Sequence, residues 1–229
     1  AYISFTKSKI LPKYDLWGVG QYFRLWSMDR WHTSVSNLFI YTVLFLILCI
    51  VIGVILAILL DQKIRGEGVL RTIYLYPMAL SFIVTGTAWK WIMNPTMGIE
   101  KFFIDIGFVN FTFDWLVTSG MSIYCVVIAG VWQSSGFIMA IFLAGLRSID
   151  DEIIKAAKID GAGIFSIYTK IVLPMMRPVF MSAIVILVHL SIKSYDLIIA
   201  LTAGGPGTSS DMPAIFMTQY AFNRSEVAL

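Results

Sequence analysis

Charged residues are scarce in this 229-residue chain, where Asp, Glu, Lys and Arg together make up 14% of the sequence. An ordinary soluble domain is about a quarter charged. Hydrophobic residues reach 58% and the mean hydropathy is +0.80. One core of this length could not bury so much apolar surface. The composition excludes a soluble enzyme, a disordered tail and a nucleic-acid-binding protein, and it indicates a polytopic membrane protein.

Residues that build disulfides, metal sites and phosphate sites are also few. The two cysteines, Cys49 and Cys125, lie in apolar runs, so no disulfide framework is indicated. The two histidines, His32 and His189, lack a carboxylate or thiol cluster at metal-ligand spacing, so we expect neither a metal nor a cofactor in this chain. The sequence has no G-x-x-x-x-G-K-[ST] motif, and we therefore do not expect the chain to hydrolyse ATP.

Four long stretches are apolar enough to cross a bilayer, which requires about 20 residues at a rise of about 1.5 Å each. These stretches cover residues 33–60, 72–94, 116–146 and 171–200. The second contains Pro77, which a membrane helix tolerates when neighbouring groups pair with the carbonyl that the proline leaves free. The fourth is the least apolar and includes Arg177 and Asp196. We expect an all-α fold, a transmembrane helical bundle.

The distribution of Lys and Arg predicts the orientation of the bundle. One side of the membrane holds the connections 61–71 and 147–170, and the other side holds the remaining loops. The two sides carry equal numbers of Lys and Arg, but the first side is shorter, so its positive charge is denser. The positive-inside rule then favours a cytoplasmic location for 61–71 and 147–170.

Residues 147–174 read RSIDDEIIKAAKIDGAGIFSIYTKIVLP and are polar enough to leave the bilayer. Ser148 followed by Asp151 resembles a capping box at the start of a helix. We expect that helix to end near Gly161, because glycine readily takes the left-handed conformation, and a second short helix to run over 164–171. Four apolar residues share one face of the first helix, namely Ile149, Ile153, Ala156 and Ala157. The pattern leaves open an ordinary amphipathic connection and a docking element for a cytoplasmic protein.

The spacing in this segment resembles the EAA loop of ABC importer permeases. That motif is E-A-A, three residues, G, nine residues and I-x-L-P, and the chain matches it from Ala156 to Pro174. One position departs from the motif, because Lys155 stands where the family most often has Glu. The resemblance implies a type I ABC importer permease fold and a set of residues that couple the chain to an ATPase. They are Lys155, Ala156, Ala157, Asp160, Gly161, Ala162 and Pro174.

Further stretches are similar to carbohydrate permeases of the maltose-transporter type. They include G-x-x-x-Y-x-x-L from Gly18, the W-K-W run from Trp89, N-P-x-x-G from Asn94 and L-T-A-G-G-P from Leu201. The family core has six helices, and the four spans correspond to its second to fifth. We therefore expect residues 1–229 to form a single permease domain without the first and last family helices.

The resemblance also implies partners and a location. The chain would form half of a translocation pathway in the bacterial cytoplasmic (inner) membrane, with a second permease subunit. Two copies of a cytoplasmic ABC ATPase would bind ATP and Mg²⁺, and an extracytoplasmic sugar-binding protein would deliver the solute. The positions implied along the sugar pathway are Tyr74, Met78, Gly130, Ser134, Leu187, Leu190, Ser191 and Ser194. Helix packing explains small residues at such positions equally well.

An ion-coupled secondary transporter is the alternative function. Such a protein needs carboxylates inside the membrane, and Asp196 is the only one in the four spans. Lys193 lies three residues earlier and can pair with it on a helix. A membrane-embedded enzyme would need a convergent nucleophile, base or metal set, which the sequence does not offer.

Overall fold

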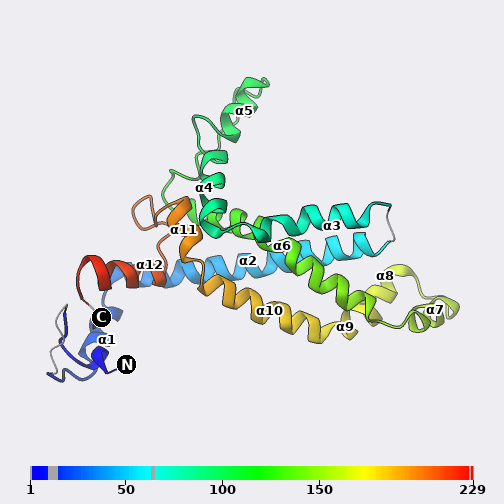
Figure 1. Cartoon of the computed structure of the whole chain (residues 1–229), viewed down its shortest axis with the longest axis horizontal. Helices are drawn as coiled ribbons and strands as arrows, with labels where there is room; N and C mark the ends of the chain where they lie inside the picture. Colours follow the sequence, from blue (N-terminus) through cyan, green and yellow to red (C-terminus); the bar gives the residue numbers. More distant parts are fainter. Residues whose placement is uncertain (1, 10–14, 63–64, 227, 229) are drawn as a thin grey trace. The chain divides into compact units, whose positions relative to one another are not determined.

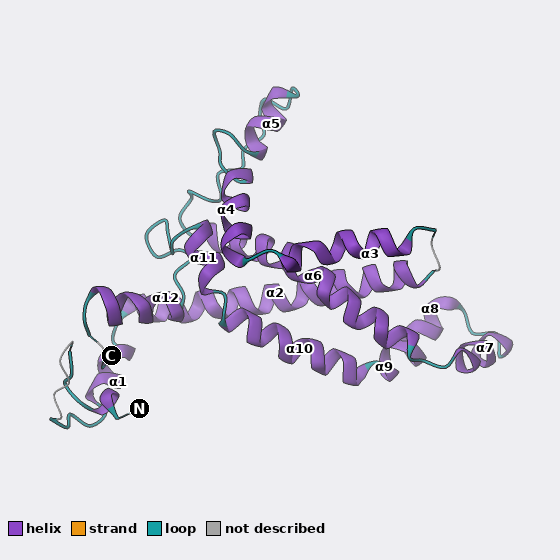
Figure 2. Ribbon diagram, in the orientation of Figure 1, coloured by secondary structure: helices purple, strands orange, loops and turns teal. Residues whose placement is uncertain are grey.

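The computed structural model describes residues 2–9, 15–62, 65–226 and 228. Within these ranges the chain forms helices and one isolated antiparallel β-bridge, between Thr6 and Leu16 (Figures 1 and 2). The chain divides into two compact units. Unit 1 comprises Ala1–Thr42, Phe82–Ala129 and Ser191–Leu229, and unit 2 comprises Val43–Ser81 and Gly130–Leu190. The helical architecture agrees with the prediction from hydropathy.

The α-helices in chain order are α1 (Gly20–Trp26), α2 (Asp29–Asp61), α3 (Glu67–Leu75), α4 (Phe82–Ile92), α5 (Ile99–Asp105), α6 (Ser122–Arg147), α7 (Asp151–Ile159), α8 (Ile164–Ile167), α9 (Leu173–Met175), α10 (Arg177–Ile192), α11 (Tyr195–Leu201) and α12 (Pro213–Thr218). The short 3-10 helices are Ile3–Phe5 and Tyr76–Ala79, and the π-helices are Tyr168–Val172 and Gln219–Asn223. By length and composition α2 and α6 can each cross a membrane. Two further spans are possible, each made of two segments with a bend between them. One combines Glu67–Ala79 with α4, and the other combines Ile164–Met175 with α10. The four membrane spans stay predictions.

Helix α6 makes the close contacts of unit 2 through small residues. A methyl group added at Gly53 of α2 would lie 2.7 Å from the Ile138 side chain of α6. One added at Gly145 of α6 would lie 2.9 Å from Val179 of α10. Gly136 of α6 lies directly against the carbonyl group of Tyr74 in α3. Small residues that let backbones approach closely are typical of helix packing in membranes.

The stretch predicted as one span over 72–94 is two helices separated by a break. A 3-10 turn containing Pro77 follows α3, and Leu80 is then extended, with φ −79° and ψ 147°. Its carbonyl accepts a hydrogen bond of 2.8 Å from Nε2 of Gln133 in α6. The break is tolerated because this side chain replaces the helical partner that the carbonyl has lost.

In unit 1, α4 and α11 pack closely and the loop after α11 is tied to the start of α2. A methyl group added at Gly86 of α4 would lie 2.7 Å from Ala200 of α11. Arg30 Nε donates to Asp211 Oδ2 at 2.6 Å, and Asn37 Nδ2 donates to the Asp211 carbonyl at 3.0 Å. Asp211 is 1% exposed, so this ion pair holds the loop in a buried position.

We predict that Gly136→Ala destabilises the chain, because the added methyl group would collide with the Tyr74 carbonyl. Overpacking of this kind costs about 1–3 kcal/mol, a fall of several degrees in apparent Tm. The control is Gly68→Ala in α3, where the methyl group meets no atom within 4 Å. Thermal unfolding in detergent should show a loss for Gly136→Ala and none for Gly68→Ala. Equal melting of the two variants would contradict the close approach of α6 and α3.

We also predict that Asp211→Ala loosens the loop after α11, because it leaves the Arg30 guanidinium without its carboxylate. Arg30 keeps partial access to water, so we expect a loss of about 1–3 kcal/mol. Asp105→Ala removes the carboxylate of an exposed pair with Lys101 and should cost under about 1 kcal/mol. Limited proteolysis and thermal unfolding would compare the two. The Arg30 ion pair does not hold the loop if both variants behave alike.

Candidate functional site

The segment with the EAA spacing lies in unit 2 and begins with a well-defined helix start. The N-cap of α7 is Asp150, whose Oδ1 accepts a hydrogen bond of 2.9 Å from the Glu152 amide. The predicted capping box is wrong, because the Ser148 hydroxyl donates to the Gly145 carbonyl at 2.7 Å and so belongs to the end of α6. The first turn of α7 also contains Asp151 and Glu152, whose negative charges interact favourably with the positive end of the helix dipole.

The D-G-A run ends α7 in a Schellman motif. The Gly161 amide donates to the Lys158 carbonyl at 3.1 Å, and the Ala162 amide donates to the Ala157 carbonyl at 3.0 Å. Gly161 has φ +78°, the left-handed conformation that this motif requires. The predicted end of the helix at Gly161 is confirmed. The motif therefore fixes a sharp, rigid turn between two short helices.

The second helix differs in detail from the prediction for 164–171. It begins as α8, continues as the π-helix Tyr168–Val172 and is followed by α9, in which Pro174 occupies the first turn. Proline has no amide hydrogen, so the carbonyls of the preceding turn must find other partners. The π-helix that ends at Val172, before Pro174, has the wider i→i+5 pairing, which occurs mostly as a single turn within an α-helix. The I-x-L-P end of the motif therefore coincides with a change in helix geometry.

The apolar side chains of this segment are left uncovered by the chain itself. Among the residues of α7 only Ala157 is buried, so the predicted apolar face does not pack internally. The Ile159 and Phe165 residues are 86% and 82% exposed. Lys155 is also exposed and pairs with Glu152 at 2.8 Å. We call the exposed apolar residues Ile153, Ile159, Ile164 and Phe165 the docking patch.

Such a patch, apolar and rimmed by charges, is typical of a protein–protein contact surface. Ile159, Ile164 and Phe165 are absent from the site residues that we predicted from the sequence. Their signal was three large apolar residues among the small and polar residues of 158–166. Figure 1 shows α7 and α8 at the end of unit 2 where α2 ends and α3 begins.

The eight positions expected along a sugar pathway have different environments. In unit 2, Gly130, Ser134 and Leu187 are buried, Met78 and Leu190 are half-buried and Tyr74 is exposed, and in unit 1 Ser191 and Ser194 are buried. The Ser134 hydroxyl has no hydrogen-bond partner among the described residues. The Ser191 hydroxyl accepts a bond of 3.0 Å from Thr42, and the Ser194 hydroxyl donates to the Ser191 carbonyl at 2.7 Å. Their roles stay predictions.

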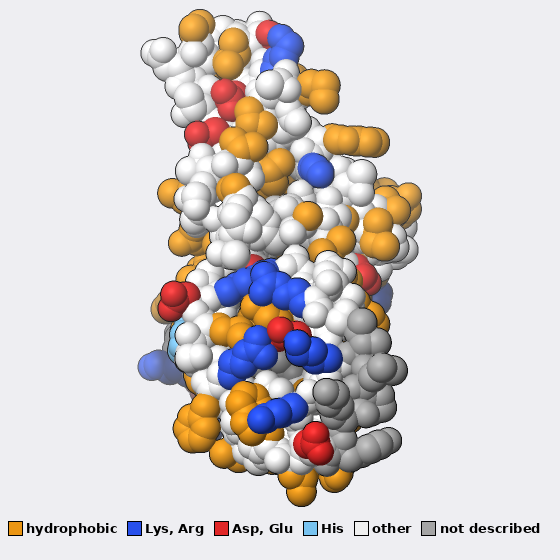
Figure 3. All heavy atoms as spheres, turned by 90° about the vertical axis from the view of Figure 1, so that its left-hand side faces the viewer, with side chains coloured by type: hydrophobic (Ala, Val, Ile, Leu, Met, Phe, Trp, Pro, Cys, Tyr) orange, Lys and Arg blue, Asp and Glu red, His pale blue; other side chains and the backbone are white. Residues whose placement is uncertain are grey.

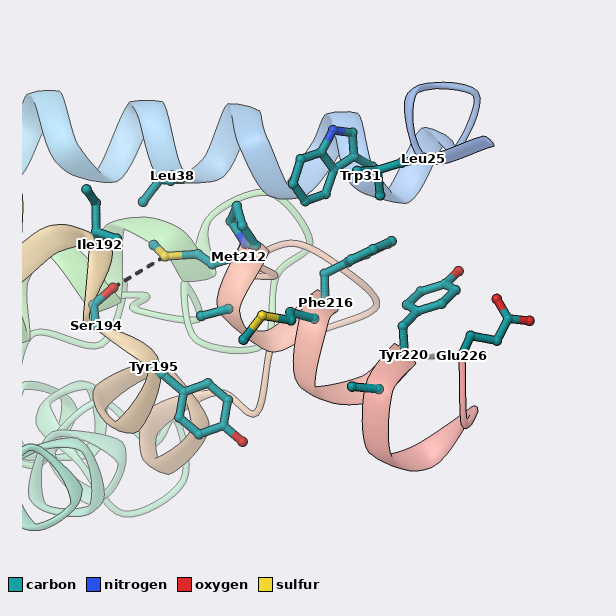
Figure 4. Close-up of a pocket in the computed structure, with 14 residues that line it drawn as sticks. Leu25, Trp31, Leu38, Ile192, Ser194, Tyr195, Met212, Phe216, Tyr220 and Glu226 are labelled. Carbon is teal, nitrogen blue, oxygen red and sulfur yellow. Dashed lines mark hydrogen bonds between the residues drawn. The ribbon is translucent and has the colours of Figure 1, made fainter. Parts of the chain in front are cut away.

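Unit 1 contains an apolar pocket of about 480 Å³ between the start of α2, the start of α11 and α12 (Figure 4). Trp31, Met212 and Phe216 line it, and Glu226 lies at one end. The Ser194 hydroxyl donates to the Met212 sulfur at 3.4 Å. The lining is mainly apolar, and its polar side chains include Ser194, Tyr195 and Tyr220.

A smaller hollow of about 200 Å³ in unit 1 is surrounded by basic side chains (Figure 3). Lys7, Lys9 and Arg24 line it together with Glu226. Arg24 pairs with Glu226 at 2.8 Å, and Lys7 lies over the Trp17 ring at 5.3 Å from its centroid. Two of these three cations are therefore engaged within the chain.

Comparison with known proteins identifies the family. The model of the binding-protein-dependent transport system inner membrane component matches residues 49–228. The probable ABC transporter permease protein PH1215 of Pyrococcus horikoshii is 40% identical over 99% of this chain and 78% of its own length. The xylose/arabinose import permease protein XacH of Haloferax volcanii is 36% identical, over 99% and 72%. The trehalose/maltose transport system permease protein MalF of Thermococcus litoralis is 29% identical, over 92% and 71%.

Solved structures show the same fold. A crystal structure of a bacterial ABC transporter involved in import of the acidic polysaccharide alginate matches with a TM-score of 0.80 at 19% identity. The match covers 92% of this chain and 74% of that one. These findings confirm the predicted all-α permease fold and favour the first of the two functions that the sequence predicts. The chain belongs to the family of binding-protein-dependent transport system inner membrane components and is a non-catalytic permease subunit of an ABC importer.

Proposed function

We propose that this permease belongs to an ATP-driven sugar importer in the cytoplasmic membrane of a prokaryotic cell, and that residues 147–174 couple it to the ATPase. The observation that carries the coupling proposal is the docking patch, since a rigid helix–turn–helix presents large apolar side chains that the chain leaves exposed. The EAA spacing supports an ABC ATPase as the protein that covers them. We call residues 147–174 the coupling segment.

A carbohydrate is the solute class that the relatives support. Their printed names assign xylose and arabinose to XacH, and trehalose and maltose to MalF. The expected partners are a second permease, two ATPase copies and an extracytoplasmic sugar-binding protein. A related alginate transporter, solved in complex with a pentasaccharide-bound periplasmic protein, supports the last of these.

The geometry of the coupling segment suits the transmission of movement. Asp150 caps one end of α7 and the Schellman motif at Gly161 closes the other, so the helix can move as one rigid body. Closure of the ATPases on ATP would displace α7 and bias the permease between an outward-open and an inward-open state. In this scheme ATP acts on the sugar pathway at a distance, and the permease performs no chemistry.

We predict that Phe165→Asp releases the ATPase without unfolding the permease. Phe165 is exposed in the chain, so a carboxylate there is tolerated by the fold but is placed in an apolar contact in the assembled transporter. Loss of a central aromatic contact costs about 2 kcal/mol or more, so ATPase co-purification should fall more than about tenfold.

The matched control for this test is Phe108→Asp, which changes an exposed phenylalanine in the loop after α5. That variant should retain the ATPase at the parental level. If Phe165→Asp also retains it and imports radiolabelled xylose, arabinose, maltose or trehalose like the parent, the coupling segment is wrongly assigned.

A second prediction concerns the sugar pathway. The Ser134 hydroxyl is buried without a partner among the described residues, so it is available to a solute hydroxyl. Ser134→Ala should raise the solute concentration for half-maximal uptake about tenfold while leaving ATP hydrolysis intact. The control is Ser182→Ala, where the hydroxyl is exposed and bonded to the Pro178 carbonyl. Identical uptake curves for the two variants would reduce Ser134 to a packing residue.

A further inference from the structure

Arg147 connects the ends of three helices of unit 2. It is the last residue of α6, and its Nη2 lies 2.8 Å from Oε1 of Glu67, the first residue of α3. Its Nε lies 3.5 Å from Oδ1 of Asp61, the last residue of α2. One guanidinium therefore bridges the two helices that flank the α2–α3 connection.

The other flank of the coupling segment reaches the same connection. Tyr168, which directly follows α8, lies beside the Gln62 side chain, close enough for that side chain to act on the tyrosine hydroxyl. On the N-terminal side of α7, only two residues separate Arg147 from Asp150, the N-cap of that helix. The chain before α7 is thus paired with the ends of α2 and α3, and the chain after α8 lies next to the end of α2.

Among the described residues, Arg147 pairs with both carboxylates of this cluster, and Arg71 adds a weaker attraction for Glu67. Glu67 and Arg147 form an ion pair of 2.8 Å. Asp61 at the C-terminal end of α2 is unfavourable for the helix dipole, and the guanidinium compensates it. Without Arg147, two carboxylates would be left beside each other and would repel.

The exposure of the cluster indicates that it positions helices and contributes little to the stability of the fold. The side chains of Arg147, Asp61 and Glu67 are 42%, 32% and 25% exposed. Ion pairs with this access to water contribute little to the free energy of folding. The cluster nonetheless joins elements that are distant in sequence, so its loss changes their relative orientation more than their folding.

We infer that Arg147 is a positioning residue for energy coupling: through Asp61 and Glu67 it holds the coupling segment in a fixed orientation to α2 and α3. Movement of the ATPase is then passed to these helices and is not lost in bending of the chain between α6 and α7. The inference rests on the proposed function of residues 147–174 as the ATPase contact.

The test compares solute uptake with ATP hydrolysis in the assembled transporter, reconstituted in vesicles with its binding protein. The solutes are radiolabelled xylose, arabinose, maltose and trehalose. In Arg147→Gln the ATPase should still co-purify and hydrolyse ATP, while solute imported per ATP falls about tenfold, a typical coupling factor. The conservative variant Arg147→Lys keeps a positive charge between Asp61 and Glu67 and should restore most of the loss. Lys101→Gln removes an exposed ion pair with Asp105 in α5 and should match the parent.

Three results would overturn the inference. The first is an Arg147→Gln variant that imports as much solute per ATP as Lys101→Gln. The second is an Arg147→Lys variant that stays as poorly coupled as Arg147→Gln. The third is release of the ATPase by Arg147→Gln. The Phe165→Asp variant shows whether such a result refutes only the role of Arg147 or also the proposed function of the coupling segment. If Phe165→Asp loses the ATPase while Arg147→Gln couples normally, only the positioning role is wrong. If Phe165→Asp keeps the ATPase, the coupling segment itself is wrong.

Discussion

Backbone amide and carbonyl groups inside a bilayer have no water to bind, and this constraint decides where the chain can be irregular. The break after α3 is the clearest case in unit 2. The Leu80 carbonyl is satisfied by Gln133 of α6, which requires α6 to lie close to the break. Gly136, one turn further along α6, makes that approach sterically possible against Tyr74. The amide side chain of Gln133 and the absence of a side chain at Gly136 together allow the helix break at Leu80.

The same helix connects the membrane part of unit 2 with the coupling segment. Its contacts fix α6 against α2, α3 and α10, and its last residue, Arg147, begins the path to α7. Beyond that residue the chain is polar and exposed, and its caps satisfy the helix ends locally through Asp150 and Gly161. A rigid helix on a rigid base is the arrangement that a mechanical linkage between two proteins needs.

The helical fold, the permease family and the turn at Gly161 were predictable from the sequence, because apolar length, motif spacing and glycine are each local features. The prediction failed on the cap of α7, since Ser148 and Asp150 both suit an N-cap and the choice depends on where α6 ends. It could not foresee that the apolar face of α7 stays uncovered, because an amphipathic pattern is the same for an internal and an external partner. The ion pairs of Arg147 join residues that are far apart in the sequence, so no local sequence pattern predicts them.

The central claim is that the docking patch contacts an ABC ATPase, and site-specific photocross-linking in the assembled transporter tests it most directly. A photoreactive residue in place of Ile159 should form a cross-linked band with the ATPase, and the yield should change when ATP is added. The control is the same residue in place of Met181, an apolar position on α10 that is also well exposed, at 65% against 86% for Ile159. Cross-linking to the ATPase from position 159 and none from position 181 is the predicted result. No ATPase band from position 159 in an intact complex would contradict the account.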